Sequence, residues 1–542
     1  MTFDLALLDG KICTENPSQS EAEAIGIVGN RIALVGSSKE VLGGCTAQTR
    51  VAALGGRRVL PGFNDAHVHF YLGGASLSSV QLRDANSVGE LRERVAAFAG
   101  KQPKGEWILL GSWDPERWPT GSQLDCRLID EVTPEHPVFL TRADAHTSVA
   151  NSLAMKLAGV TDATADVSGG EIGRRADGTL NGIFKDAAQA LIIRAIPPPT
   201  KGQMVRALQA AQTHASRNGI TSIQDMGLLG IQALQCSADL FRAYQELHHS
   251  GNLTVRVSLH TPLAAWKRLA DLGVRAWFGN ERLRIGGVKA FADGSLASRT
   301  AWFFEPYADA EWTCGIPSDD MSNPEQMLND LAACDEAGLQ LAVHAIGDRA
   351  NHEVLACFEE IERRNGRRDR RWRIEHAQHV RSCDLHRFSD SGVVASVQPY
   401  HLSDDGRWAE TRIGKERAKE TYAFRSLIDA GAKIALGSDW YVAPINPLLT
   451  IWAATTRRTL DGAYPDGWVS EQKISVQEAV HAYTVGAAYA SGDEQIKGSL
   501  QTGKLADIAV LSADIFSIDP ADIGGVQVDM TVFDGRIVFE RD

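Results

Sequence analysis

The stretch LPGFNDAHVHF, residues 60–70, joins an apolar run to two histidines, His67 and His69. Successive side chains of a β-strand point to opposite faces, so residues two apart share a face. Both imidazoles therefore lie on one side of a predicted strand, where they form a two-ligand metal clip. The chain on either side of this stretch indicates which fold holds that strand.

Eight short apolar runs with the character of buried parallel strands follow one another through the middle of the chain. They are Arg58–Pro61 continuing into LPGFNDAHVHF, Ile220–Gln224, Val255–Leu259, Leu283–Lys289, Leu339–His344, Trp372–His376, Val393–Gln398 and Lys433–Ser438. Helical patterns lie between the later runs and after the last one, at Pro324–Glu336, Ala350–Asn365, Lys415–Ala430 and Ser475–Ser491. This alternation predicts an α/β fold in the form of a (β/α)₈ TIM-like barrel.

The two ends of the chain have a different, β-rich pattern. Gly-Asn at 29–30 and Asp-Gly at 534–535 are turn signals between short apolar runs. We therefore expect residues 1–58 and 498–542 to form one small composite β-sandwich domain, with residues 59–497 forming the barrel.

The connection between the first two predicted barrel strands is far longer than a strand–helix–strand crossover requires. Residues 70–215 contain elements of their own and several tryptophans, among them Trp113. We expect this segment to be an inserted subdomain over the barrel mouth, because it follows the strand that carries the two histidines.

The composition is that of a globular protein, with 542 residues, 44% of them hydrophobic and 23% charged. The net charge of −13 argues against nucleic acid or an anionic membrane as a partner. The sequence has neither a signal-peptide pattern nor an apolar run of about 18 residues. Its eight cysteines form no Cys-x-x-Cys pair, which fits reduced thiols. We expect a cytoplasmic protein that acts on a small molecule, with a homodimer as the commonest assembly.

Metal-binding residue types stand at the carboxyl ends of the predicted barrel strands. Lys289 ends the fourth run, His344 the fifth and His376 the sixth, and Asp439 follows the eighth. These strand ends meet at one mouth of a barrel, where the active sites of this fold lie. With the two histidines of LPGFNDAHVHF, they predict a coordination shell for one or two divalent metal ions, with zinc expected.

Eight segments carry a resemblance to a known family. They are LPGFNDAHVHF (60–70), AHTSVANSLA (145–154), KAFADGSLASRTA (289–301), AVHAIGDRAN (342–351), RIEHAQHV (373–380), SVQPYHLSDD (396–405), ALGSDW (435–440) and GSLQTGKLADIAVL (498–511). On these motifs the chain resembles the amidohydrolase superfamily of metal-dependent hydrolases. More narrowly, it resembles the amidohydrolase family 3 group, the YtcJ-like proteins that include N-substituted formamide deformylase. The chain departs from the family pattern at Tyr441, where a proline usually follows the tryptophan of ALGSDW.

The resemblance implies a dinuclear metal site. The implied ligands are His67, His69 and Asp439 for the more buried metal, His344 and His376 for the second, and Lys289, carboxylated by carbon dioxide, as the bridge. A lysine ammonium has no lone pair, but burial and neighbouring cations lower its pKa and supply the free amine that carboxylation requires. The alternative for Lys289 is a salt-bridging residue beside a mononuclear site.

Asp439 is the residue that we expect to carry the acid/base chemistry. A metal ion lowers the pKa of bound water from about 15.7 to about 7. A carboxylate within hydrogen-bond reach takes the proton and later delivers it to the leaving nitrogen. The expected function is an amidohydrolase that cleaves a C–N bond other than a peptide bond by attack of metal-bound hydroxide. An ester, lactone or carbamate hydrolase, a non-catalytic ligand-binding relative, and a purely ligating Asp439 remain as alternatives.

Weaker candidates for substrate contact come from the insertion and from loops at the predicted mouth. They are Trp113 and His146 in the insertion, Asp293 and Arg299 in the loop after Lys289, and Gln398 and His401 after the seventh strand. Packing is the alternative role for the two insertion residues, and holding the loop is the alternative for Arg299. Glu375 is expected to point away from His376 along its strand and to be structural.

Overall fold

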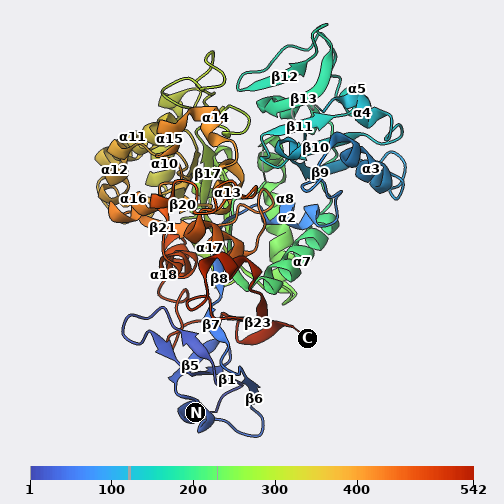
Figure 1. Ribbon diagram of the computed structural model, residues 1–542. Coiled ribbons are helices and arrows are strands. Elements are labelled where there is room, and N and C mark those ends of the chain that lie inside the picture. The colour runs from blue at the N-terminus through green and yellow to red at the C-terminus, as the bar shows by residue number, and fades with distance from the viewer. Residues whose placement is uncertain (1, 120–123, 229, 542) are drawn as a thin grey trace.

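The computed structural model describes residues 2–119, 124–228 and 230–541. Within them, a sheet of eight parallel strands runs in the order β8-β14-β15-β17-β18-β19-β20-β21, with the short β16 (Phe278–Gly279) paired to β17 (Figure 1). The strands are β8 Phe63–Val68, β14 Ile220–Asp225, β15 Arg256–Pro262, β17 Leu283–Phe291, β18 Gln340–Ala345, β19 Arg373–His376, β20 Val394–Val397 and β21 Lys433–Leu436. The predicted TIM-like barrel is confirmed.

The sheet almost closes on itself beside the predicted metal ligands. Val68 forms a parallel bridge to Trp440, and the His69 backbone N–H donates to the Trp440 carbonyl over 2.7 Å. A Cβ atom on Gly437 would lie 2.6 Å from the His67 backbone nitrogen. The end of β21 approaches β8 this closely because residue 437 has no side chain.

The first predicted barrel strand begins too early, although its end agrees with the observed strand. Arg58–Pro61 forms β7, which pairs with β2 (Lys11–Cys13) and β22 (Ile508–Leu511) outside the barrel. The first barrel strand begins only at Phe63. Both segments are buried and apolar, so hydrophobicity alone does not distinguish them. They differ in the strands with which they pair.

Helices follow the later strands as expected. The helix α10 spans Pro324–Glu336, and α11 spans Asp348–Asn365. The segment Lys415–Ala430 was predicted as one helix but forms α15 (Lys415–Ala418) and α16 (Phe424–Asp429). Tyr422, with a φ of 51°, lies between them in a conformation that a continuing helix does not permit. None of the helices in the described ranges is long and apolar enough to cross a membrane.

Strands from both ends of the chain pack together below the barrel. One sheet has the order β5-β4-β1-β6 and the other β24-β23-β22-β7-β2-β3. Their bounds are β1 Leu5–Leu8, β3 Glu21–Ala22, β4 Ala24–Val28, β5 Arg31–Gly36, β6 Arg50–Ala53, β23 Val528–Phe533 and β24 Arg536–Glu540. Leu7, Ile25, Val59 and Ile508 belong to one apolar core that both sheets share. Both termini therefore lie at the same end of the molecule (Figure 1).

The segment between β8 and β14 contains a five-stranded sheet of its own, in the order β12-β13-β11-β10-β9. Its elements are α2 Phe70–Ser76, α3 Val88–Ala99, β9 Ile108–Trp113, α4 Cys126–Asp130, β10 Val138–Arg142, β11 Thr147–Ala150, α5 Ser152–Leu157, β12 Gly170–Arg174, β13 Leu180–Asp186, α6 Ala190–Ile193 and α7 Lys201–Arg217. In Figure 1 this sheet lies beside the barrel, at the end away from the chain termini.

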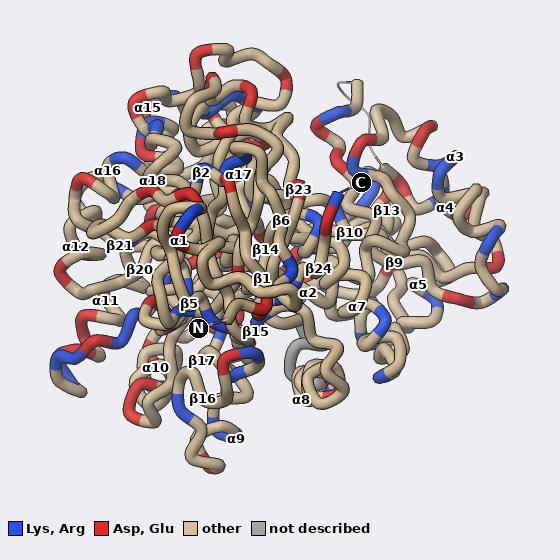
Figure 2. Tube along the Cα trace, turned by 90° about the horizontal axis from the view of Figure 1, so that it is seen from below, with Lys and Arg blue, Asp and Glu red and all other residues tan. Residues whose placement is uncertain are grey.

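Charged residues of both signs are interspersed along the outer helices, as Figure 2 shows. On α11, for example, Glu360 accepts hydrogen bonds from Arg363 and Arg364, each over 2.7 Å. Such exposed pairs contribute little to stability because water and salt screen them.

Candidate metal centre

Three buried side chains from three barrel strands offer ligand atoms to one point. A ring nitrogen of His67, a ring nitrogen of His376 and a carboxylate oxygen of Asp439 all lie within 4.8 Å of one another. The Oδ1 atom of Asp439 is 3.6 Å from Nε2 of His67 and 3.6 Å from Nε2 of His69. This spacing suits a cation held between them, because the atoms are too far apart for direct hydrogen bonds.

The other predicted ligands line the same pocket, which has a volume of about 90 Å³. The His344 ring lies 4.5 Å from the His376 ring, which in turn lies 5.1 Å from the His67 ring, measured between centroids. Lys289 is buried and lines this pocket from β17. The structure therefore brings all six predicted ligands to one cavity at the carboxyl end of the barrel.

Burial decides the charge of these side chains. It lowers the pKa of His67, His344 and His376 well below the ordinary value of histidine, so the imidazoles are neutral and keep a lone pair. Burial also lowers the pKa of Lys289 and raises that of Asp439, while their mutual attraction opposes both shifts. A lowered lysine pKa increases the fraction of free amine, the form that carboxylation requires.

The donor set fits a divalent metal ion. Asp439 Oδ1, Lys289 Nζ and His401 Nε2 are buried without a hydrogen-bond partner among the described residues. Leaving a buried polar atom unsatisfied costs about 1–3 kcal/mol. A cation at this point would satisfy the carboxylate and the neutral imidazoles, and histidine nitrogen with carboxylate oxygen is a ligand set that zinc and other divalent metals accept.

Two of the histidines are oriented by hydrogen bonds on the side away from the pocket. His67 Nδ1 is 2.6 Å from Glu375 Oε2, and His69 Nδ1 is 2.9 Å from the Gly227 carbonyl. Each contact leaves Nε2 facing Asp439. Metal-binding histidines usually have such a partner on the second nitrogen, which fixes the tautomer and the ring plane.

The sequence analysis predicted the wrong direction for the Glu375 side chain. Its carboxylate contacts His67 and accepts a hydrogen bond from Arg373 over 2.7 Å, inside the barrel. Strand alternation would separate Glu375 from His376, but His376 and Ala377 have φ values of 73° and 42°. The backbone leaves the strand conformation there, so both side chains reach the same centre.

Asp65 is a site residue that the sequence analysis missed, although it lies within LPGFNDAHVHF. Its Oδ1 accepts hydrogen bonds from the backbone N–H groups of His67 (3.2 Å) and Ser438 (2.9 Å). Its Oδ2 accepts one from the Tyr483 hydroxyl over 3.0 Å. Asp65 thereby ties the segments that carry His67 and Asp439 to each other.

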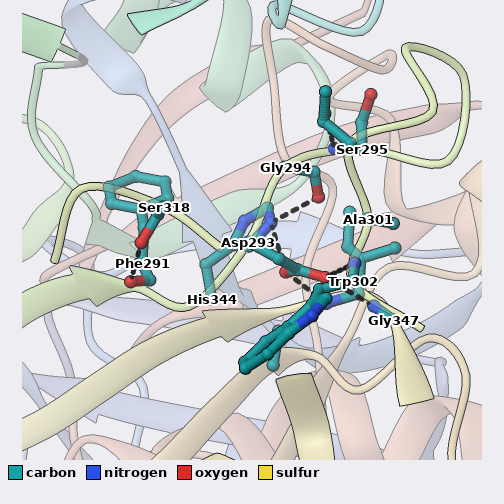
Figure 3. Close-up of polar contacts among 12 residues, drawn as sticks. Phe291, Asp293, Gly294, Ser295, Ala301, Trp302, Ser318, His344 and Gly347 are labelled. Carbon is teal, nitrogen blue, oxygen red and sulfur yellow. Dashed lines mark hydrogen bonds and ion pairs between the residues drawn. The ribbon is translucent and has the colours of Figure 1, made fainter. Parts of the chain in front are cut away.

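Asp293 occupies a position that differs from its predicted role. Its carboxylate accepts hydrogen bonds from the backbone N–H groups of Trp302, Ile346 and Gly347 at 2.7–3.0 Å (Figure 3). It lies 3.5 Å from Nε2 of His344, which also contacts the Gly294 carbonyl. The carboxylate therefore holds its loop around His344, and burial raises its pKa to about 7.

Of the other predicted substrate contacts, two face the pocket. His401 Nε2 is 3.5 Å from Asp439 Oδ2. His146, from the insertion, lies with its ring centroid 5.7 Å from that of His344 and its Nδ1 2.6 Å from Asp186 Oδ1. Burial lowers the pKa of His146, but the hydrogen bond and charge of Asp186 outweigh this, so the pKa is raised.

Three predicted contacts lie outside the lining of this pocket. Trp113 packs in the apolar core of the insertion, stacked on Trp118 with its Nε1 donating to the Leu140 carbonyl over 3.0 Å. Arg299 pairs with Asp309 at 2.7 Å and thus holds its own loop. Gln398 is buried and donates to the Ser396 carbonyl over 3.0 Å.

One wall of the pocket consists of ion pairs between the insertion and the barrel loops. Arg407 lies 3.1 Å from Asp114, and Arg83 lies 3.2 Å from Asp404. These four residues line the pocket together with the metal-binding candidates. Asp404 lies in the motif SVQPYHLSDD, but no short motif shows how the residues pair, because each pair joins residues far apart in the sequence.

Comparison with known proteins places this site in a family. The model of the Amidohydrolase family matches residues 50–539. The chain is 38% identical to Protein LONG AFTER FAR-RED 3 of Arabidopsis thaliana, covering 95% of this chain and 89% of that protein. It is 27% identical to N-substituted formamide deformylase of Arthrobacter pascens, covering 99% and 98%.

A solved structure is similar along almost its whole length. It is that of an uncharacterized metal-dependent hydrolase from Pyrococcus horikoshii, with a TM-score of 0.76 and 27% sequence identity. The match covers 95% of this chain and 99% of that one. With a barrel of this topology and a His/Asp centre at its mouth, the chain belongs to the amidohydrolase family of metal-dependent hydrolases.

Proposed function

We propose that this protein hydrolyses an amide-type C–N bond of a small molecule, with Asp439 as the general acid and base. The observation that carries the proposal is the convergence of four neutral histidines, a lysine with a lowered pKa and one carboxylate on a buried pocket. The relative from Arthrobacter pascens, whose name gives N-substituted formamides as its substrates, supports the C–N bond as the target.

The donor set supports an assignment of the ligands. We propose that His67, His69 and Asp439 would hold one divalent ion, that His344 and His376 would hold a second, and that carboxylated Lys289 would be the bridging ligand. A bound ion, with zinc expected, supplies Lewis-acid activation of water and of the carbonyl group. Glu375 keeps Nε2 of His67 directed at the site through the 2.6 Å contact.

Asp439 is positioned to move a proton within this site. Its backbone N–H donates to the His67 carbonyl over 2.7 Å, and its Oδ1 atom is buried without a protein hydrogen-bond donor among the described residues. The carboxylate of Asp439 accepts a proton from water as the water oxygen bonds to the carbonyl carbon. When the C–N bond breaks, Asp439 delivers the proton to the nitrogen, which leaves as the amine.

We propose the domain organisation on the same basis. Strands from both chain ends share one sheet, which supports a composite β-sandwich of residues 1–58 and 498–542, with β7 added to it. Asp114, Arg142 and His146 line the pocket, which supports a segment 70–215 that forms part of the wall over the barrel mouth.

The experiment combines metal analysis with a substrate screen. Purified protein should contain one to two divalent ions per chain and should hydrolyse members of a panel of formamides and N-acyl amines. Turnover confined to esters or lactones would replace the proposed bond class, and full turnover by metal-free protein would overturn the mechanism. Lys289→Ala tests the bridge: the proposal expects loss of one ion, and two retained ions would exclude a carboxylated lysine.

A further inference from the structure

A second, much larger cavity adjoins the metal pocket. It has a volume of about 1360 Å³, compared with about 90 Å³ for the metal pocket. The two cavities share Ala145, His146, Lys289 and Phe291 in their linings. They therefore meet where side chains of the insertion lie beside side chains of β17.

The small pocket cannot hold a whole organic substrate. Sites for small molecules usually measure about 300–1,000 Å³. A volume near 90 Å³ has room for a few water molecules or for one reacting group. When the carbonyl group of a substrate reaches Asp439, the rest of the substrate must lie outside the small pocket. One wall of the small pocket is the ion-paired surface of Arg407 and Asp114.

The larger cavity offers a wide apolar surface beside its polar groups. From the insertion it is lined by Leu72, Trp107, Leu109 and Phe139, and from the barrel loops by Met226 and Leu263. The stiff Pro197–Pro199 segment closes part of its edge. Of its polar groups near the metal pocket, the Asp293 carboxylate already accepts backbone hydrogen bonds, and Asp186 contacts His146 through Oδ1, while Oδ2 of Asp186 has no partner among the described residues. Apolar walls of this extent favour an apolar ligand.

We infer that the larger cavity binds a bulky apolar substituent of the substrate, an alkyl chain or an aromatic ring on the amide nitrogen or acyl carbon. This inference rests on the proposed function and names its substrate class. The scissile group enters the small pocket past His146 and Lys289, while the substituent stays between the insertion and the barrel. Size selection then depends on the larger cavity and bond cleavage on the smaller one.

The test uses the metal-loaded enzyme and a series of N-alkylformamides from ethyl to hexyl. Each methylene group transferred from water to an apolar wall is expected to raise kcat/KM about 3- to 4-fold. Ala190→Trp, on α6, and Ala75→Trp, on α2, place a large ring in the cavity from two different helices. Both should flatten the dependence on chain length while leaving turnover of the ethyl compound near that of the unmodified enzyme.

Ala333→Trp is the matched control, because Ala333 is a half-buried helical alanine, on α10, that lines neither cavity. It should preserve the chain-length dependence. A kcat/KM that does not change with chain length, or the same dependence in the two cavity variants as in the unmodified enzyme, would overturn the inference. Two cavity variants are used so that one folding failure does not remove the test.

A second measurement separates this inference from the proposed function. If no amide is hydrolysed, the proposed function fails. Binding of the neutral fluorescent probe N-phenyl-1-naphthylamine then tests separately whether the larger cavity binds an apolar ligand. One probe per chain, displaced by hexylamine and weakened at least about ten-fold by Ala190→Trp, would support an apolar ligand site. Equal binding by the unmodified protein, Ala190→Trp and Ala333→Trp would reject it.

Discussion

The two adjoining cavities at the barrel mouth differ in how the chain builds them. The metal pocket is small, and its six predicted ligands are polar side chains on or just after five barrel strands. The larger cavity has a wider apolar surface and is assembled from the insertion, including its helices α2 and α7, and from barrel loops. The candidate metal ligands thus stand on or beside rigid strands, whereas the cavity that we propose for the substrate substituent lies at a junction between two substructures.

Removal of the metal should distinguish the roles of the two cavities with the largest effect. A chelator is expected to abolish turnover, because the imidazoles and Asp439 lose the ion that activates water. Binding of N-phenyl-1-naphthylamine should persist, since its walls contain no ligand except Lys289. Metal content, activity and probe fluorescence are measured on the same sample. Loss of both activity and probe binding would show that the two cavities depend on one another.

Asp439→Asn should have the next largest effect. The substitution preserves size and one ligand oxygen but removes the group that accepts the proton. Turnover is expected to fall about 10²–10⁴-fold, whereas metal content should fall much less and the slope of the chain-length series should not change. Metal analysis and steady-state kinetics check this. A loss of metal in proportion to the loss of activity would assign Asp439 to ligation alone.

Glu375→Asp tests the orientation of His67. The shorter side chain keeps a carboxylate beside Arg373 but withdraws it from Nδ1 of His67, which is 2.6 Å away in the native protein. Loss of such a supporting contact typically reduces metal affinity or activity about 10- to 100-fold. Competition with a graded series of chelators measures the affinity, and unfolding of the metal-free protein is the control. Unchanged affinity would mean that Glu375 serves only to neutralise Arg373.

Trp113→Phe should have the smallest effect and should leave both cavities unaltered. It removes the hydrogen bond from Nε1 to the Leu140 carbonyl in the core of the insertion. The free energy of unfolding is expected to fall by about 1–2 kcal/mol. Trp118→Phe, which removes an equivalent bond to the Ala85 carbonyl, is the matched variant. A raised KM without a loss of stability would return Trp113 to the list of substrate contacts.

Strand periodicity predicted most of the barrel, and its errors have local causes. Runs such as Leu283–Lys289 and Lys433–Ser438 stand within a few residues of the observed strands because buried parallel strands are continuously apolar. Arg58–Pro61 has the same character but pairs with a strand from the far end of the chain. Pairing is a long-range property, and apolar character alone does not specify it.

The sequence by itself determined which side chains gather at the candidate metal centre, because a barrel brings the carboxyl ends of all its strands together. Only the tertiary structure decided the supporting groups. Glu375 reaches His67 because the backbone turns at His376, and Asp65 joins two segments that are distant in the sequence. Trp113 and Phe139 are both buried apolar residues of the insertion, yet they belong to separate core clusters, and of the two Phe139 lines the larger cavity. Which face of an element meets a neighbour depends on packing between substructures, which the order of residues along one strand does not encode.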